Sequence, residues 1–218
     1  MKKINRRLYI RITNKCNRWC SFCYYKNDPK ITNDMTLDTL QEILEKELET
    51  PLVDNFLRVE LSGGEPSLCK NINKILEYLS TLPRVYFTME TNGTNIMNSN
   101  FLELAVKFKK FNFLKISLNS ELIDSDFEWI NNIVVFQQFA KENNINYVFN
   151  ARFKDQNDKS RLEQIIKDYN IYPSYGNITF YPIHNVNLYR DGKLPYYGKP
   201  MTIYDVDGTI LVDYHKNK

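Results

Sequence analysis

The segment LYIRITNKCNRWCSFC (Leu8–Cys23) joins a short β-rich run to a group of cysteines. Leu8–Thr13 alternates apolar and polar side chains, which is typical of a strand with one buried face. Cys16, Cys20 and Cys23 follow at once, in the spacing Cys-x3-Cys-x2-Cys. The sequence therefore predicts a strand whose carboxyl end opens into a loop that carries three thiols.

Further β-rich runs alternate with stretches of helical periodicity along the chain. Strand, helix and strand in this order pair in parallel through right-handed crossovers, which predicts an α/β fold. A closed eight-unit barrel takes about 250 residues, so for this chain we expect a partial (β/α)6 barrel of the TIM type. The predicted strands are Leu8–Thr13, Leu57–Ser62, Val85–Glu90, Phe113–Leu118, Asn146–Phe153 and Ile178–Ile183, and the predicted helices are Thr36–Glu49, Asn71–Leu82, Phe101–Lys110, Phe127–Asn143 and Lys159–Tyr169.

The end of the chain has a different pattern. A Pro- and Gly-rich stretch, Leu194–Pro200, precedes two alternating runs around Asp207-Gly208, a dipeptide typical of a two-residue hairpin turn. We therefore expect the barrel over residues 1–193, and a linker with a C-terminal β-hairpin over residues 194–218.

Within this hairpin, Asp205-Val206-Asp207-Gly208-Thr209 resembles the first motif of haloacid-dehalogenase phosphatases. That motif opens a large α/β domain, and too few residues follow Thr209 to build one. The motif is therefore assigned to the hairpin alone.

Charge and hydropathy exclude some classes of partner. The 29 Lys and Arg residues against 26 Asp and Glu residues give a net charge of +3, too small a surplus to indicate a nucleic-acid partner. The start of the chain lacks the uninterrupted apolar core of a signal peptide, and no segment reaches the roughly 20 apolar residues of a membrane span. We expect a cytoplasmic protein with neither a membrane nor a nucleic-acid partner.

Three thiolates this close together can bind three irons of a four-iron cubane, which leaves the fourth iron open to an outside ligand. A structural zinc site is an alternative, with His184 or His215 as the fourth ligand. A disulfide is disfavoured in a reducing cytosol. Cys69 stands apart in the sequence, and a lone cysteine is more often a small buried residue than a ligand.

The cysteine spacing just after a first strand resembles the signature of the radical S-adenosylmethionine (SAM) superfamily. Three more segments match that family in order: LSGGEP (Leu61–Pro66) after the second strand, ETNG (Glu90–Gly93) after the third, and KISL (Lys115–Leu118) in the fourth. Phe22 matches the aromatic residue that the family places against the adenine. The resemblance extends from Leu8 to Ile183.

The resemblance implies a radical SAM enzyme with one [4Fe–4S] cluster on Cys16, Cys20 and Cys23. The methionyl amino and carboxylate groups of SAM would chelate the open iron. Reductive cleavage of SAM would then yield a 5′-deoxyadenosyl radical that abstracts hydrogen from the substrate, with a flavodoxin- or ferredoxin-type protein as the reductant.

Several residues are candidates for contacts with SAM. Glycines let backbone approach a ligand, Glu65 could stabilise the SAM amine or brace its loop, and a buried Arg152 would need an anion such as the SAM carboxylate. Plain structural explanations also exist: a turn for the glycines and Asn92, and a solvated face for Asn150 and Arg152, which alternate on one strand. The candidate SAM-binding residues are Phe22, Gly63, Gly64, Glu65, Asn92, Ser117, Asn119, Asn150 and Arg152.

The hairpin resembles the opening of the SPASM extension found on many peptide-modifying radical SAM enzymes, but the cysteines for auxiliary clusters are absent. We therefore expect a single cluster and a substrate that is a peptide or a small metabolite. A cofactor-biosynthesis enzyme of the 7-carboxy-7-deazaguanine synthase type and a glycyl-radical activase are alternatives within the superfamily. A non-catalytic iron–sulfur electron carrier or zinc-binding protein is the alternative outside it.

Overall fold

A computed structural model describes residues 4–23, 33–49, 56–107, 111–183 and 202–213. The chain divides into two compact units, the first formed by residues 1–89 with residues 186–218 and the second by residues 90–185. Each unit is described by itself below.

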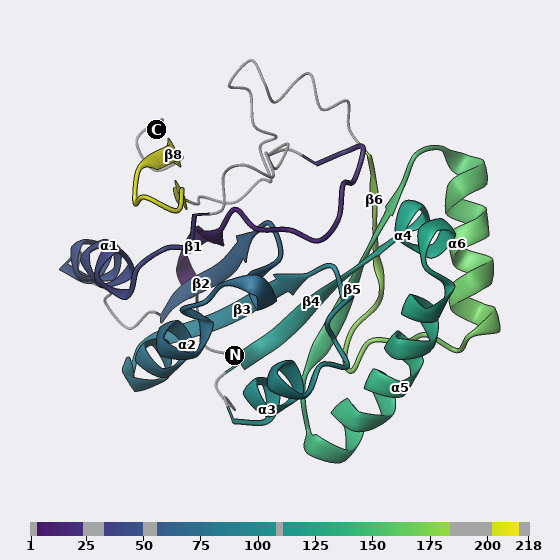
Figure 1. Cartoon of the computed structure of the whole chain (residues 1–218), viewed down its shortest axis with the longest axis horizontal. Coiled ribbons are helices and arrows are strands. Elements are labelled where there is room, and N and C mark those ends of the chain that lie inside the picture. Colours follow the sequence, from purple (N-terminus) through teal and green to yellow (C-terminus); the bar gives the residue numbers. More distant parts are fainter. Residues whose placement is uncertain (1–3, 24–32, 50–55, 108–110, 184–201, 214–218) are drawn as a thin grey trace. The chain divides into compact units, whose positions relative to one another are not determined.

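The first unit is built on a sheet in which the N-terminal strand is central (Figure 1). Strand β1 pairs in parallel with β2 on one side and with β7 on the other. Strand β3 extends the sheet in parallel beyond β2, and β8 pairs antiparallel with β7. The strands are β1 (Ile4–Thr13), β2 (Phe56–Gly63), β3 (Val85–Thr91), β7 (Thr202–Tyr204) and β8 (Ile210–Asp213).

Helices α1 (Leu37–Glu49) and α2 (Ile72–Thr81) connect these strands and contact one another. The strands turn alternate apolar side chains to one face, and the register places Leu8 beside Val59 and Val59 beside Phe87, all three fully buried. The apolar stripe of each helix, such as Leu40 of α1, is buried as well. The apolar side chains that recur at every second residue of the strands and about every 3.6 residues of the helices thus form one core.

The opposite face of this sheet is polar. Arg7 and Arg58 both form ion pairs with Glu60, whose side chain is only 4% exposed. The Tyr9 and Ser62 hydroxyl oxygens lie 2.6 Å apart. The interior strands of this unit therefore carry an apolar core on one side and a network of charges and hydroxyls on the other.

The second unit has three parallel strands in the order β4, β5, β6. Figure 1 shows α5 and α6 running beside these strands. Helix α5 begins after Asp126, whose carboxylate accepts from the Trp129 backbone N–H, and it ends at Asn143, followed by Asn144 in the left-handed region as its C-cap. The elements are α3 (Ser99–Lys107), β4 (Phe111–Asn119), α4 (Ser120–Ser125), α5 (Phe127–Asn143), β5 (Tyr147–Phe153), α6 (Gln156–Asp168) and β6 (Thr179–Pro182).

The predicted α/β class, the six strands and the C-terminal hairpin are confirmed. The short helix α4 was not predicted, because six residues are too few for a periodic pattern to stand out. Helix α6 begins before the predicted Lys159, since Asp155 accepts from the Asp158 N–H and caps it at an earlier position.

The predicted two-residue hairpin turn is wrong in detail. Strand β7 ends at Tyr204 and β8 begins at Ile210, so Asp205–Thr209 forms the connection. The Asp205 N–H donates to the Thr209 carbonyl at 2.9 Å, and the Gly208 N–H donates to the Asp205 carbonyl at 3.0 Å. The boundary between residues 193 and 194 stays a prediction, and the linker Leu194–Pro200 lies outside the described residues.

Among the helices that the structure describes, none is both long enough and apolar enough to cross a membrane.

Candidate functional site

The three cysteines of the predicted cluster lie on the loop that follows β1, and all three are half-buried. The Cys23 N–H donates to the Cys20 carbonyl at 3.0 Å, which closes a turn between these two residues. Phe22 within this turn is half-buried, whereas Trp19 is 70% exposed. The chain is thus folded back on itself between the second and third thiols.

The start of this cysteine loop is fastened to the segment after β2. The Gly64 N–H donates to the Thr13 carbonyl at 2.8 Å, and the Glu65 N–H donates to the Lys15 carbonyl at 2.7 Å. A Cβ at Gly63 would lie 2.2 Å from the Thr13 carbonyl oxygen, and a Cβ at Gly64 would lie 2.1 Å from that of Lys15. Both glycines are therefore needed for two backbones to touch directly beside the first cysteine.

Glu65 is fully buried in this contact. Its carboxylate accepts from the Ser67 N–H at 3.2 Å and caps the short 3₁₀ helix η1 (Pro66–Leu68). Bracing of its own loop, one of the two predicted roles, is therefore present. A contact with the SAM amine stays a prediction.

A buried carboxylate, Asp34, holds the same loop from another side. Its side chain is 1% exposed, lies 2.6 Å from the Lys15 Nζ, and accepts from the Thr13 hydroxyl at 2.7 Å. Burial by itself raises the pKa of Asp34, but the hydrogen bonds from Lys15 and Thr13 and the charge of Lys15 outweigh it and hold the pKa below its usual value. Sequence reasoning missed Asp34, because no local pattern relates it to the loop.

The chemistry of this donor set fits an iron–sulfur cluster. Three thiols within eight positions, half-buried on a loop with a fixed start, can ligate three irons. Among the described residues, no three Cys, His, Asp or Glu side chains converge closely enough to form a metal site. Metal binding is coupled to local folding, so the metal can draw its ligands together as it binds. The ligand assignment stays a prediction, and His184 and His215 of the zinc alternative lie outside the described residues.

Cys69 belongs to the core, as the sequence suggested. Its side chain is 2% exposed, and its thiol lies 3.4 Å from the Ile12 carbonyl oxygen, to which it donates. Burial raises the pKa of the Cys69 thiol to about 11. The thiolate that reacts with alkylating agents is therefore scarce at neutral pH.

We expect Cys69 to resist iodoacetamide at pH 8 in the cluster-free protein while Cys16, Cys20 and Cys23 are alkylated. A pKa of about 11 against an ordinary 9.0 lowers the thiolate fraction about 100-fold. Mass spectrometry of the tryptic peptides checks this, with a sample unfolded in urea as the control in which all four react. Modification of Cys69 at the same rate as the other three would contradict its buried placement.

In the second unit, four candidate residues come together on adjacent strands. The register of β4 and β5 places Ser117 beside Asn150 and Asn119 beside Arg152, so that the four share one face. The Asn119 carbonyl oxygen Oδ1 accepts from the Leu122 N–H at 2.9 Å and caps α4. The Arg152 guanidinium lies 5.9 Å from the centre of the Tyr181 ring.

One more charged pair accompanies this face. Lys115 precedes Ser117 by two residues on β4, and its ammonium lies 2.9 Å from the Glu90 carboxylate. Both residues stood in segments that matched the family, but neither was selected as a site residue. Their positions could have indicated this: each lies two residues from another polar residue along the chain, and residues two apart on a strand point to the same face.

The predicted Asn92 site is a tight turn. The Asn92 Oδ1 accepts from the Thr94 N–H at 2.9 Å and from its hydroxyl at 2.6 Å. The Asn92 carbonyl accepts from the Trp129 indole at 2.9 Å, and Gly93 follows with a φ of +76°. The structure therefore contains the turn that was the alternative role for Asn92, while a contact with SAM stays a prediction.

Parallel strands joined by helices, with a cysteine loop at the carboxyl end of β1, form an α/β fold of the kind that carries its functional site at the carboxyl ends of the strands. The family model described as the radical SAM superfamily matches residues 10–151. The chain belongs to the radical SAM superfamily, whose enzymes use a [4Fe–4S] cluster and SAM.

Individual relatives differ in how much of the chain they match. The antilisterial bacteriocin subtilosin biosynthesis protein AlbA of Bacillus subtilis (strain 168) is 31% identical over 52% of this chain and 25% of its own length. The 7-carboxy-7-deazaguanine synthase of Clostridium acetobutylicum is 30% identical over 86% of this chain and 80% of its own.

The solved structure of Streptococcus suis SuiB bound to precursor peptide SuiA aligns with a TM-score of 0.64 at 16% identity. The alignment covers 95% of this chain and 59% of SuiB. At this low identity, the likeness shows the partial-barrel fold and nothing more. The chain thus spans a quarter of AlbA and little more than half of SuiB.

Proposed function

We propose that this enzyme binds a single [4Fe–4S] cluster through Cys16, Cys20 and Cys23 and modifies a peptide by hydrogen abstraction. The observation that carries the proposal is the cysteine loop, fastened at its start by the Gly63-Gly64-Glu65 segment. The likeness to AlbA, a bacteriocin biosynthesis protein, and to SuiB, a protein solved with a bound precursor peptide, supports the peptide as substrate.

When bound, the reduced cluster and SAM supply one-electron cleavage of the sulfonium to methionine and a 5′-deoxyadenosyl radical, which takes a hydrogen atom from the substrate. The chain's own contribution is to hold and orient these groups. The backbone at Gly63 and Gly64 would accept hydrogen bonds from the N–H groups of the SAM amine, and Glu65, whose carboxylate accepts from the Ser67 N–H, would be a further acceptor beside that amine.

For the candidate residues of the β4–β5 face, contacts with SAM are proposed from the family resemblance. Ser117 and Asn150 offer neutral hydrogen-bonding groups for ribose hydroxyls, and Arg152 offers a cation for the carboxylate. Asn119 would act through its amide nitrogen, because its Oδ1 caps α4. Phe22 would cover the adenine, and Asn92 would contribute through the backbone of its turn.

The first experiment is anaerobic reconstitution with iron and sulfide, reduction with dithionite, and an assay for 5′-deoxyadenosine after addition of SAM. We expect product from the wild type and none from the Cys16→Ala/Cys20→Ala/Cys23→Ala variant. A fully loaded cluster without SAM cleavage would instead indicate an electron carrier. Zinc in place of iron would overturn the cluster assignment.

A second candidate function is synthesis of 7-carboxy-7-deazaguanine, because the synthase of Clostridium acetobutylicum matches this chain over 80% of its own length. Expression of this chain in a bacterial strain that lacks its own 7-carboxy-7-deazaguanine synthase distinguishes this function from peptide modification. Restored formation of 7-carboxy-7-deazaguanine by the wild type, but not by the triple cysteine variant, would favour the second candidate. No restoration, together with active SAM cleavage in vitro, would favour the peptide.

The electron donor is proposed to be a flavodoxin- or ferredoxin-type protein. Replacement of dithionite by such a protein with its reductase should sustain SAM cleavage in the wild type.

A further inference from the structure

A buried arginine connects the C-terminal hairpin to the cysteine loop within the first unit. Arg11, on β1, is 7% exposed. One guanidinium nitrogen, Nη1, donates to the Asp205 carboxylate at 2.8 Å. The other, Nη2, donates to the Asn14 Oδ1, also at 2.8 Å. Asn14 lies two residues before Cys16, so one side chain reaches both the hairpin and the start of the loop.

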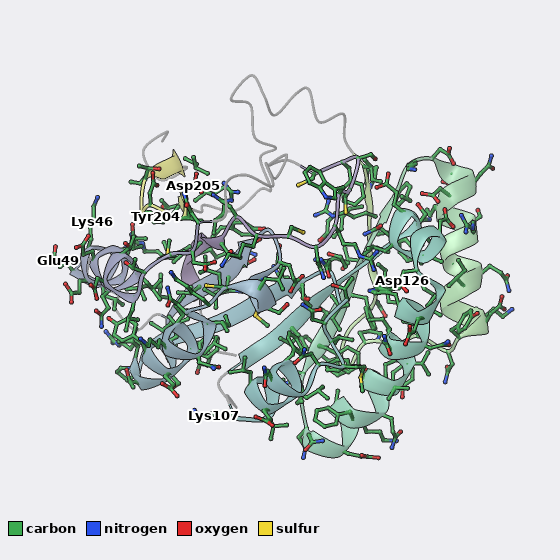
Figure 2. The ribbon with its side chains drawn as sticks, viewed as in Figure 1. Lys46, Glu49, Lys107, Asp126, Tyr204 and Asp205 are labelled. Carbon is green, nitrogen blue, oxygen red and sulfur yellow. The ribbon has the colours of Figure 1, made fainter. Side chains whose placement is uncertain are left out.

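The hairpin is built so that Asp205 meets this arginine. Parallel pairing of β1 and β7 sets Tyr204 beside Ile10. The residues that follow these two in the chain, Asp205 and Arg11, therefore also lie beside one another. Separately, the Tyr204 hydroxyl donates to the Glu47 carboxylate of α1 at 2.5 Å. Figure 2 shows Tyr204 and Asp205 together at this position.

The connection after β7 holds the Asp205 side chain in place. Its carboxylate accepts from the Val206 N–H at 2.8 Å, and its carbonyl accepts from the Gly208 N–H at 3.0 Å. Gly208 has a φ of +83°, and a Cβ there would lie 3.0 Å from Thr39 Cγ2 of α1. The Asp-x-Asp-Gly-Thr sequence, set aside as a phosphatase motif, thus forms a loop that presents its first carboxylate to Arg11.

We propose that Asp205 is a positioning residue for the iron–sulfur site and acts through Arg11 and Asn14. This inference rests on the proposed function, in which Cys16 ligates the cluster. A buried guanidinium needs a counterion, and removal of that counterion favours a move toward solvent. Such a move would withdraw the hydrogen bond from Asn14 and loosen the backbone that leads into Cys16.

The test uses the full chain and does not depend on enzyme activity. In the cluster-free protein, the rate of Cys16 alkylation by iodoacetamide reports how ordered the loop is, and Cys69 in the core reports global unfolding. In Asp205→Asn we expect Cys16 to react several-fold faster, up to about tenfold if one charge-assisted hydrogen bond is lost, with Cys69 still protected. Asp205→Glu, which keeps the carboxylate, should restore most of the protection.

Tyr204→Phe is the matched control. It removes the hydrogen bond from the hairpin to α1 and leaves the Arg11 contact intact. We expect its Cys16 rate to equal that of the wild type. An equal increase in Tyr204→Phe and Asp205→Asn would overturn the specific role of Asp205 in favour of simple docking of the hairpin.

Reconstitution then connects loop order to the cluster. The wild type should hold a full [4Fe–4S] cluster, and Asp205→Asn should lose iron several-fold faster to a chelator and show an altered electron paramagnetic resonance signal with SAM. A wild type that holds no cluster would overturn the proposed function and this inference together. A loaded wild type with an Asp205→Asn variant identical in alkylation, iron loss and spectrum would overturn this inference alone.

Discussion

Replacement of Gly64 by alanine is expected to abolish cluster binding and SAM cleavage. The new Cβ would lie 2.1 Å from the Lys15 carbonyl oxygen, 2.6 Å from the Lys15 carbonyl carbon and 3.0 Å from the Cys16 Cβ. Two of these atoms are backbone, so no side-chain rotation relieves the clash. The cysteine loop must move away from the end of β2.

That movement breaks the two backbone hydrogen bonds, from Gly64 to Thr13 and from Glu65 to Lys15, that hold the start of the loop. Overpacking of this kind typically lowers the free energy of unfolding by about 1–3 kcal/mol, so the rest of the chain should still fold. The loss should therefore fall on the site. Iron and sulfide content after reconstitution and 5′-deoxyadenosine formation are the measurements.

Gly176→Ala is the control for this experiment. Gly176 has a φ of +70°, so alanine there carries backbone strain, but its Cβ would meet nothing within 4 Å. We expect Gly176→Ala to bind a full cluster. If Gly64→Ala does the same, the contact between the two loops is not needed to form the site.

The strands and the cysteine loop could be predicted because their signals are local. Alternation along Leu8–Thr13 and the close spacing of the cysteines are visible in a window of a few residues, and the family motifs follow successive strands. The Gly63-Gly64 pair was selected for a contact with SAM, which stays a prediction. The sequence could not reveal that both glycines are needed for close contact with the backbone of Thr13 and Lys15, because this contact depends on the register of β1 and β2.

The missed residues act across long separations in the chain. Asp34 reaches Lys15 across the cysteine loop, and Asp205 reaches Arg11 from the other end of the chain. A single sequence carries no signal for such pairs, because any of its 26 acidic residues could neutralise a given cation. The hairpin turn was predicted too short for a related reason: hydrogen bonds between Asp205, Gly208 and Thr209 set its length, which a dipeptide preference does not describe.

Trp129 is 1% exposed and supports the Asn92-Gly93 turn. Its indole N–H donates to the Asn92 carbonyl at 2.9 Å, and a Cβ on Gly93 would lie 3.1 Å from the same nitrogen. In Trp129→Ala we expect the free energy of unfolding to fall by about 3–5 kcal/mol, the usual cost of truncating a buried aromatic residue. Urea unfolding followed by far-ultraviolet circular dichroism measures this.

Trp129→Phe separates packing from the hydrogen bond. Phenylalanine keeps much of the buried apolar volume and leaves the Asn92 carbonyl without its donor, so we expect a smaller loss of about 1–3 kcal/mol. If Asn92 contributes to the SAM site through its turn, the phenylalanine variant should also bind SAM more weakly at temperatures where it is fully folded. Weaker SAM binding without any loss of stability would contradict the supporting role of the indole.

The chain provides its own control, because its other tryptophan, Trp19, is 70% exposed. Surface substitutions usually change stability by less than about 0.5 kcal/mol, so the urea concentration at the midpoint of unfolding should be the same for Trp19→Ala as for the wild type. This variant also leaves Trp129 as the sole tryptophan, and its emission should be that of a buried indole until unfolding. Equal destabilisation by Trp19→Ala and Trp129→Ala would show that the indole of Trp129 is not the buried support of the Asn92-Gly93 turn.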